Sequence, residues 1–517
     1  TSTGGSSATA APTEPTTGQF FSGLPQTACE RRWNMVYGKR ALTVPCLAAV
    51  LLGVQSDPAA ASESPPKPPN LLFILMDNIG QDWFGCYGSL EGQTPEMDKL
   101  AEGGVQFRHC YVMPLCSTSR HVFLTGRYPF RTGWNVHHDA AIYGGGYFDW
   151  NREITFARAL RSAGYATAIA GKWQINNLFD QPDALAKHGF DEHCIFPEGP
   201  RGHPAHTNRY WDPYVLENGR RIRTEGQFGP DLFTDYLIDF IRRRRDRPFL
   251  AFYSTVLTHL PATNTPLNKG RDLTERELLA GMVRYADHCV GRLVAALDAS
   301  GLRENTIVLI TTDNGTPAVF GGKVGGRVFE AAAETMVEGD MKEGSIDVPF
   351  VVNCPALVPG GRVSNALIDS SDVFPTLLDL AGAKPPQGVT VDGKSFAAIL
   401  RGGFDAAPRR EWIFSQYAHQ RLVRNDRHKL RSNGRFHDLL RDPLEKHDLS
   451  ASTDPKIIAQ RDRLQRALDA FPPDAEMWFE PRSISARRLK IGDPNRRAAD
   501  DHLAPEEPTS KRPSSGD

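Results

Sequence analysis

A cysteine and an arginine one helical turn apart are the first residues of this sequence whose spacing suggests chemistry. The segment "PLCSTSRHVFLTGRYP" (114–129) predicts a helix that begins at the Ser-Thr-Ser run and ends at Gly126. A helix start presents unpaired backbone N–H groups and the positive end of the helix dipole, which favour an anion. Residues four apart share a helix face, so Cys116 and Arg120 are able to face one ligand. For an isolated cysteine, a small buried thiol beside a surface arginine is the simpler interpretation, so further residues are needed.

Polar residues follow several short apolar runs, at the points where those runs end. The runs are Leu71–Met76, Ala166–Ala170, Phe249–Tyr253, Ile307–Ile310 and Pro349–Val352. Continuous apolar runs predict strands that are buried on both faces of a parallel sheet. The polar residues that follow the first four runs are Asp77-Asn78, Gly171-Lys172, Thr258-His259 and Asp313-Asn314. Because open α/β sheets bind ligands outside the carboxyl ends of their strands, we expect these groups to converge on one edge, near Cys116 and Arg120.

The two Asp-Asn pairs suggest a metal site. Their four hard oxygen donors, on Asp77, Asn78, Asp313 and Asn314, suit calcium or magnesium rather than zinc or copper. Either pair alone is equally consistent with a turn after a strand, but two pairs at equivalent strand ends favour a metal. Arg120, Lys172 and His259 supply hydrogen-bond donors for a tetrahedral oxyanion. Together with a nucleophile at a helix start, these groups predict a hydrolase of sulfate or phosphate esters.

Helical patterns alternate with the apolar runs. The clearest covers Leu273–Ser300, where Thr274 and Glu277 form a capping box and Gly301 ends the helix. This alternation predicts an α/β fold with a large, mainly parallel sheet flanked by helices. Four short strand-like segments near the C-terminus predict a smaller antiparallel sheet: Glu411–Ser415, Arg421–Val423, His428–Leu430 and Arg435–Leu440.

Composition sets the expected limits of the parts of the chain. Residues 1–34 are rich in Ser, Thr, Ala and Gly, and Met35 opens a stretch in which a basic pair precedes the apolar run Ala41–Val54 and the small residues Ala59–Ala61. This is the pattern of a secretory signal peptide, with an uncleaved membrane anchor as the alternative. We therefore expect a disordered leader and signal peptide at 1–61, a catalytic domain at 70–385, a smaller C-terminal subdomain at 386–475 and a disordered tail at 481–517. The protein is expected to be exported, and to be periplasmic or secreted.

Charge and cysteine content exclude other classes. The 517 residues include 60 Lys and Arg and 61 Asp and Glu, which give a net charge of -1, so we expect no nucleic-acid partner. Eight scattered cysteines, without a C-x-x-C pair, indicate neither a disulfide framework nor a zinc site in a chain of this length.

The chain resembles the sulfatase family, within the alkaline phosphatase-like superfamily. The matching segments follow one another in family order over roughly residues 70–400: "PNLLFILMDNIGQDWFGCYG", "TPEMDKLAEGGVQFRHCYV", "PLCSTSRHVFLTGRYPFRTG", "GYATAIAGKWQ", "ENTIVLITTDNG", "VPFVVNCPALVPGG" and "DVFPTLLDLAG". A further segment, "HDLLRDPLEKHDL" (437–449), resembles the C-terminal segment of the family. The resemblance implies the alkaline phosphatase-like fold.

The resemblance also implies roles for site residues. Cys116 matches the cysteine of C-x-P-S-R, which a formylglycine-generating enzyme oxidises to formylglycine, and the hydrated aldehyde is the nucleophile. Arg120 matches the arginine of that motif, Lys172 a lysine that contacts the sulfate, and His259 a histidine that protonates the leaving oxygen. The implied calcium ligands are Asp77, Asn78, Asp313, Asn314 and the modified Cys116. The implied substrate is a sulfated small molecule or glycan.

Some positions depart from the family pattern. Thr118 replaces the proline of C-x-P-S-R, and Asn78 replaces the second aspartate of an Asp-Asp pair. Gln174 replaces a histidine that helps hold or deprotonate the formylglycine hydroxyl. Lys323 and Lys342 are both candidates for a second active-site lysine, and neither fits the family spacing well.

Two other functions stay open. A phosphatase or phosphodiesterase of the same superfamily uses a Ser or Thr nucleophile and two zinc ions, which Cys116 and Asn314 fit less well. An inactive binder of sulfated glycans is suggested by Thr118 and Gln174. The loops Ala140–Trp150 and Glu198–Trp211, rich in Gly, aromatic and His residues, are expected to contact sugar or aryl groups, but loop composition does not identify the sulfated substrate.

Overall fold

The computed structural model describes residues 67–136, 148–199, 203–317, 341–403 and 410–475, and the backbone of the strands at 323–324 and 327–328. These residues belong to one unit, Pro65–Asp517. The predicted leader, signal peptide or anchor, and C-terminal tail lie outside the described residues. Within the described ranges, no helix combines the length and the apolar character needed to cross a membrane.

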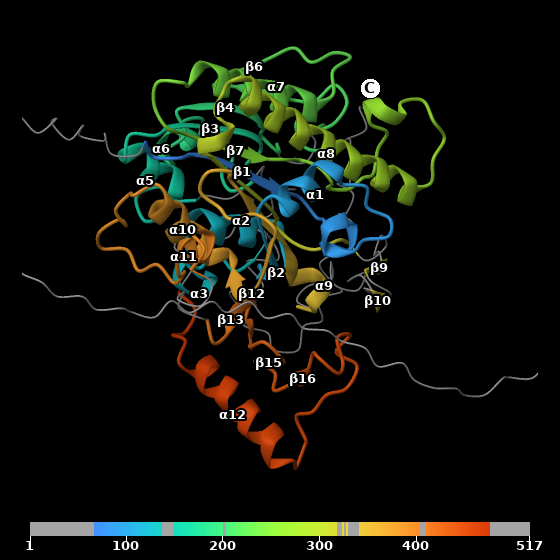
Figure 1. Cartoon of the computed structure of the whole chain (residues 1–517), viewed down its shortest axis with the longest axis vertical. Coiled ribbons are helices and arrows are strands. Elements are labelled where there is room, and N and C mark those ends of the chain that lie inside the picture. The colour runs from blue at the N-terminus through green and yellow to red at the C-terminus, as the bar shows by residue number, and fades with distance from the viewer. Residues whose placement is uncertain are drawn as a thin grey trace, which may run out of the picture. The chain divides into compact units, whose positions relative to one another are not determined.

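A ten-stranded sheet runs through the centre of the structure, in the order β12-β2-β11-β8-β1-β7-β3-β4-β5-β6 (Figure 1). Its strands are β1 (Asn70–Met76), β2 (Val105–Tyr111), β3 (Ala166–Lys172), β4 (Glu192–Phe196), β5 (Leu216–Glu217), β6 (Arg220–Arg221), β7 (Phe249–Ser254), β8 (Thr306–Thr312), β11 (Asp347–Asn353) and β12 (Arg362–Asp369). The central strands β4, β3, β7, β1 and β8 are parallel neighbours. The predicted large and mainly parallel sheet is confirmed.

One predicted strand runs in the opposite direction. The run Pro349–Val352 lies in β11, which pairs antiparallel with β8 and with β2, so its assignment to the parallel strands was wrong. Every residue of β11 after Asp347 is buried. Burial on both faces produces a continuous apolar run whatever the direction of the strand, and the sequence therefore does not reveal that direction.

Helices cover both faces of the sheet (Figure 1). The helices on one face, which pack against Leu72 and Ile74 of β1, are α1 (Pro95–Glu102), α7 (Gly229–Arg243) and α8 (Glu275–Ala299). The helices on the other face, which pack against Leu71 and Phe73, are α2 (Cys116–Thr125), α5 (Phe156–Ser162), α10 (Val373–Leu380) and α11 (Ala397–Leu400). The predicted capping box of Thr274 and Glu277 is present at the start of α8.

The remaining elements are short or C-terminal. They are α3 (Pro129–Thr132), α6 (Ala184–Lys187), α9 (Glu343–Ile346), the β9 (Lys323–Val324) and β10 (Arg327–Val328) pair, and a four-stranded sheet with the helix α12 (Pro455–Asp469). The strands of that sheet are β13 (Ile413–Tyr417), β14 (Gln420–Arg424), β15 (His428–Arg431) and β16 (Phe436–Asp438), all antiparallel. The predicted C-terminal antiparallel sheet is confirmed, whereas α12 was not predicted. The domain limits at 385 and 386 stay a prediction.

The small C-terminal sheet packs against the segment that leads into α2. Phe414 and Val423 of the small sheet share one apolar cluster with Met113, Val122 and the α3 region. This contact fixes the segment that leads from β2 into α2, where Cys116 lies.

Candidate active site

The carboxyl ends of four adjacent strands carry the predicted polar groups. β3 ends at Lys172, and Asp77 and Asp313 directly follow β1 and β8. The loop after β7 leads to His259, and the backbone N–H of Thr258 donates to the Asp77 carbonyl at 2.7 Å. Because β3, β7, β1 and β8 are neighbours, these groups meet at one edge of the sheet, as expected.

Cys116 is the first residue of α2. The helix therefore begins one residue before the Ser-Thr-Ser run, and it ends at Gly126, whose positive φ of 67° closes the last turn as predicted. Ser119 donates to the Met113 carbonyl at 2.8 Å, which holds the first turn against the preceding segment. Cys116 and Arg120 are both buried on the site side of the helix.

Arg120 lies between two buried carboxylates. Its Nε donates to Asp313 Oδ2 at 2.8 Å, and its Nη2 lies 2.7 Å from the same oxygen and 3.2 Å from Asp77 Oδ2. Its Nη1 donates to Ser254 Oγ, and that hydroxyl donates to the Lys172 carbonyl at 2.6 Å. Ser254 was not predicted as a site residue, although it directly follows the predicted strand Phe249–Tyr253.

Lys172 neutralises the same cluster. Its Nζ lies 2.8 Å from Asp77 Oδ2, and both side chains are fully buried. Burial disfavours the charged form of Asp77, but Lys172, His259 and Arg120 outweigh it and hold the pKa of Asp77 below its ordinary value. Burial and the charge of Asp77 raise the pKa of Asp313 to about 6. The two carboxyl groups therefore differ, and Asp77 carries the more persistent negative charge.

Two oxygen atoms of the predicted metal site have no hydrogen-bond partner in the part of the chain that the structure describes. Asp77 Oδ1 and Asn314 Oδ1 are buried and lack a hydrogen bond to any described residue. Asn314 Nδ2 donates to Asn78 Oδ1 at 2.7 Å, and the backbone N–H of Asn78 donates to Asp313 Oδ1 at 3.1 Å. Uncommitted buried oxygens of this kind fit a hard cation.

The predicted metal site contains few of the side chains that most often bind metal ions. No cluster of three or more His, Cys, Asp or Glu that could hold a metal ion occurs among the described residues. A cation at the strand ends would therefore rely on the amide oxygens of Asn78 and Asn314 as much as on the two carboxylates.

Gln174 contacts the predicted nucleophile. It follows β3 with a positive φ of 69°, and its Nε2 donates to Cys116 Sγ at 3.1 Å. Burial raises the pKa of Cys116 to about 11, the charges of Asp313 and Asp77 add to this effect, and Lys172 and Arg120 oppose it. At neutral pH residue 116 is thus a protonated thiol, which is a poor nucleophile.

His259 is neutral in this structure. Its Nδ1 lies 2.6 Å from the Leu260 carbonyl, which only accepts a hydrogen bond, so Nδ1 carries the proton and Nε2 is the free lone pair. Burial, Arg209 and Lys172 lower the pKa of His259 to about 3. Arg209 lies in the predicted contact loop Glu198–Trp211 and was not singled out from the sequence.

The second lysine of the family pattern stays a prediction. Lys342 lies at the start of α9, and the loop after Asn314 adjoins that helix because Gly315 donates to the Ser345 carbonyl at 2.9 Å. The side chain of Lys323, and residues 140–147 and 200–202 of the two predicted contact loops, lie outside the described residues.

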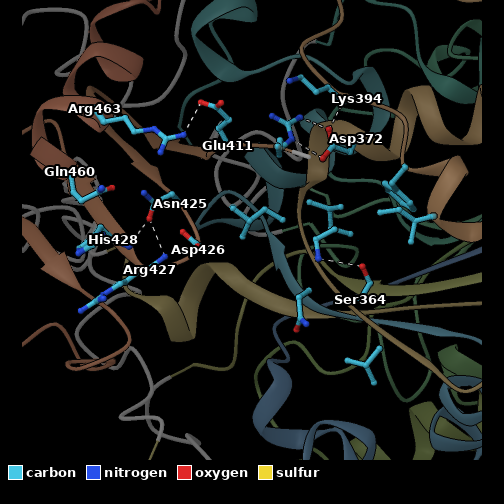
Figure 2. A pocket seen from close by; sticks show the side chains of 18 of the residues that line it. Ser364, Asp372, Lys394, Glu411, Asn425, Asp426, Arg427, His428, Gln460 and Arg463 are labelled. Carbon is cyan, nitrogen blue, oxygen red and sulfur yellow. Dashed lines mark hydrogen bonds and ion pairs between the residues drawn. The ribbon is translucent and has the colours of Figure 1, made fainter. Parts of the chain in front are cut away.

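A large cavity lies away from the strand ends. It has a volume of about 1300 Å³ and is lined by β12, the segment before α11, the β14–β15 turn and α12 (Figure 2). Asp372 and Lys394 lie on one side of it, and Asn425, His428 and Arg463 on the other. No predicted site residue lines this cavity, so size alone does not locate the chemistry.

Buried carboxylates, two cations and a residue at a helix start meet at the strand ends, which is the arrangement expected of a hydrolase of sulfate or phosphate esters. The sulfatase family model matches residues 69–383, and the model of the C-terminal region of N-sulphoglucosamine sulphohydrolase matches residues 339–469. The chain belongs to the sulfatase family, and it is a sulfuric ester hydrolase.

Curated relatives and solved structures agree with this assignment. The chain is 32% identical to N-acetylgalactosamine-6-sulfatase of Canis lupus familiaris over 68% of this chain and 70% of the relative. It is 32% identical to steryl-sulfatase of Mus musculus, over 70% of each chain. The crystal structure of Ps i-CgsB matches with a TM-score of 0.69 at 22% identity, covering 82% of this chain and 97% of that chain. A protein solved with its substrate D-glucosamine-2-N,6-O-disulfate matches with a TM-score of 0.62 at 21% identity, covering 83% and 99%. At these identities the structural matches support the fold alone.

Proposed function

We propose that the protein hydrolyses sulfate esters of carbohydrates, with residue 116 acting as the nucleophile after its oxidation to formylglycine and with a calcium ion at the strand ends. The observation that carries this proposal is the position of Cys116. It lies at the start of α2, beside a cluster of two carboxylates and two cations, as a thiol that stays protonated at neutral pH. An unmodified cysteine in this environment is a weak nucleophile, although the carboxylates and cations around it are arranged as a site. A modified residue 116 resolves this mismatch.

Formylglycine, in its hydrated form, would supply an oxygen nucleophile for the sulfur atom at this position. The Gln174 amide, which contacts Cys116 Sγ at 3.1 Å, would orient that oxygen. Lys172 and Arg120 would bind the sulfate oxygens as charge-assisted donors. His259 would give a proton to the leaving alcohol oxygen through Nε2, after the negative sulfate ester beside it has raised its affinity for a proton.

The proposed calcium site uses Asp77, Asn78, Asp313 and Asn314, with residue 116 as a further ligand. The two uncommitted oxygens, Asp77 Oδ1 and Asn314 Oδ1, support it. A bound calcium ion would polarise a sulfate oxygen as a Lewis acid, and magnesium is the alternative cation. Arg120 and Lys172 hold the carboxylates in place from the protein side.

The substrate class rests on the relatives. The N-acetylgalactosamine-6-sulfatases are 32–33% identical to this chain, and among the structural neighbours Ps i-CgsB was also solved with k-i-k-neocarrahexaose. A steroid sulfate is the second candidate, because a steryl-sulfatase matches with similar identity. We also propose that the protein is exported and that a formylglycine-generating enzyme acts on it, on the basis of the signal-peptide pattern in residues 35–61 and of Cys116.

The test compares sulfate and phosphate esters. Full-length protein, co-expressed with a formylglycine-generating enzyme, is assayed on 4-nitrophenyl sulfate, 4-nitrophenyl phosphate and a panel of sulfated sugars. We expect hydrolysis of the sulfate esters and its loss in Cys116→Ala and Cys116→Ser. Phosphate hydrolysis alone would support the phosphatase, and binding of sulfated sugars without any turnover would support the inactive binder.

A further inference from the structure

Arg209 is a buried arginine that forms no ion pair with any residue that the structure describes. Only 4% of its surface is exposed, and its Nε and Nη1 atoms are buried without a hydrogen-bond partner among the described residues. Removing a guanidinium from water is costly unless a partner compensates for the lost hydration. The mechanism proposed above does not use Arg209, so its burial calls for another explanation.

The surroundings of Arg209 place it next to the strand-end site. Its Cζ lies 5.0 Å from the centre of the Phe196 ring, which is a cation–π contact. Phe196 is the last residue of β4 and pairs in register with Lys172 of β3. Side chains of paired residues on neighbouring strands point to the same face, so Phe196 carries Arg209 on the face where Lys172 projects.

The backbone around Arg209 is also tied to the site. The hydroxyl of the next residue, Tyr210, donates to the carbonyl of Val256 at 3.0 Å and to that of His259. The Tyr210 carbonyl accepts from Gly229 N–H at 2.7 Å, at the start of α7. The loop that carries Arg209 is therefore tied to the His259 loop through Tyr210, and burial together with the charge of Arg209 lowers the pKa of His259. The ring contact of Arg209 is with Phe196, the register partner of Lys172.

We propose that Arg209 binds a second anionic group of the substrate, a sulfate or a carboxylate on the same sugar or the neighbouring one. A planar guanidinium with free donors matches both groups through paired hydrogen bonds. The inference rests on the proposed function and narrows it: the preferred substrate is a carbohydrate with at least two negative charges. A neutral sugar with a single sulfate would leave Arg209 buried and uncompensated.

The experiment uses three probes and measures binding and turnover on the full chain. The probes are N-acetylglucosamine 6-sulfate, D-glucosamine-2-N,6-O-disulfate and a monosulfated disaccharide that carries a uronate. The last two distinguish a sulfate from a carboxylate as the second anion. Calorimetric affinity and kcat/KM are compared for the parent, Arg209→Gln and Arg209→Lys. The matched control is Arg221→Gln, because Arg221 also lies over a ring, that of Tyr214 at 4.5 Å, but is exposed.

The parent is expected to prefer at least one dianionic probe. Arg209→Gln should lower the affinity for that probe by about ten- to hundredfold and the affinity for the monosulfate much less. The affinity of Arg209→Lys for the dianionic probe should lie between that of the parent and that of Arg209→Gln, because lysine keeps the charge but loses the planar pair of donors. Arg221→Gln should leave the preference as it is in the parent.

Three results would overturn the proposal: equal affinity of the parent for all probes, equal losses in Arg209→Gln on mono- and dianionic probes, or an unchanged preference in Arg209→Lys when Arg209→Gln does not fold. Absence of turnover on every probe would instead contradict the proposed function. The calorimetric comparison would still decide the role of Arg209.

Discussion

Two buried clusters in this protein each place one arginine between two aspartates, and they differ in how many of the aspartate oxygens accept hydrogen bonds. In the strand-end site, Arg120 lies between Asp77 and Asp313. Near the end of β12, Arg410 lies between Asp369 and Asp372, 3.4 Å from the former and in a two-point contact with the latter. Burial and the second carboxyl group raise the pKa of one aspartate in each cluster, Asp313 and Asp372, to about 6.

The difference lies in the partners of the carboxylate oxygens. Tyr128 accepts from Arg410 and donates to Asp369 Oδ2 at 2.6 Å, and the other Asp369 oxygen accepts from the Ser371 N–H at 2.9 Å. Both oxygens of Asp372 also accept hydrogen bonds. In the strand-end cluster, Asp77 Oδ1 has no partner among the described residues. A complete network stabilises the fold, whereas an incomplete one at a sheet edge is open to a ligand, and a shifted pKa alone does not distinguish the two.

Substitution of each arginine by methionine separates the two clusters by the property that changes, turnover or stability. Arg120→Met should reduce kcat/KM on an aryl sulfate by about a hundredfold or more, because the sulfate loses a charge-assisted donor. Arg410→Met should instead lower the free energy of unfolding by about 3–5 kcal/mol, because it leaves two buried carboxylates without their cation. Urea denaturation and turnover of 4-nitrophenyl sulfate measure both. Normal turnover in Arg120→Met would show that Arg120 does not act as a donor to the sulfate.

Substitution of His259 tests whether the strand-end cluster performs acid catalysis. His259→Ala should lose about 10²- to 10⁴-fold in rate on an alkyl or sugar sulfate, where the leaving oxygen is strongly basic. The loss on 4-nitrophenyl sulfate should be much smaller, because nitrophenolate leaves without a proton. Steady-state kinetics on the two substrates provide the test. Equal losses would mean that His259 binds the sulfate and donates no proton.

Calcium tests the unpaired oxygen directly. After chelator treatment, added calcium at about 100 times its dissociation constant should stabilise the protein by about 2.7 kcal/mol. Asp77→Asn should remove most of this gain, and Asn78→Asp should increase calcium affinity by adding a ligand charge. Calorimetric titration and thermal unfolding are the measurements, and Asp369→Asn is the matched control. If Asp77→Asn still gains the full increment, the metal lies elsewhere.

The smallest expected effect concerns Glu153, a buried carboxylate that is paired with Arg127 and lies outside both clusters. Arg127 Nη1 lies 2.8 Å from Glu153 Oε2, yet burial outweighs that contact and raises the pKa of Glu153 to about 7 from 4.5. The folded state then favours the neutral form, so stability is fully present below pH 4.5 and falls as the pH rises to 7. Glu153→Gln should remove about 1–2 kcal/mol of this fall, measured as the unfolding free energy between pH 4.5 and 8. An unchanged pH profile would show that Arg127 keeps Glu153 ionised.

The strands that carry the site could be predicted because each is a continuous apolar run that ends in a polar residue. The start of α2, to within one residue, and its end at Gly126 could also be predicted from local signals, the Ser-Thr-Ser run and the glycine. The direction of β11 could not be predicted, since burial on both faces gives the same pattern in either direction. β2 was also missed: its exposed Arg108 and half-buried His109 interrupt the apolar run.

Contacts between side chains were beyond the sequence for a different reason. The pairing of Arg120 with both Asp77 and Asp313 depends on the order β3-β7-β1-β8, which no local pattern encodes. For the same reason, nothing in the sequence set Arg209 apart from Arg410. Among the described residues, Arg209 forms no ion pair, whereas Arg410 is paired with Asp369 and Asp372.

The central claim is that residue 116 acts as formylglycine, and the mass of one peptide tests it most directly. Trypsin releases His109–Arg120, which contains Cys110 and Cys116, from protein made with and without a formylglycine-generating enzyme. Tandem mass spectrometry, combined with sulfatase activity for each sample, should locate an aldehyde at residue 116 in a fraction that rises in proportion to the activity. Full activity in protein whose peptide contains only unmodified Cys116 would contradict the account.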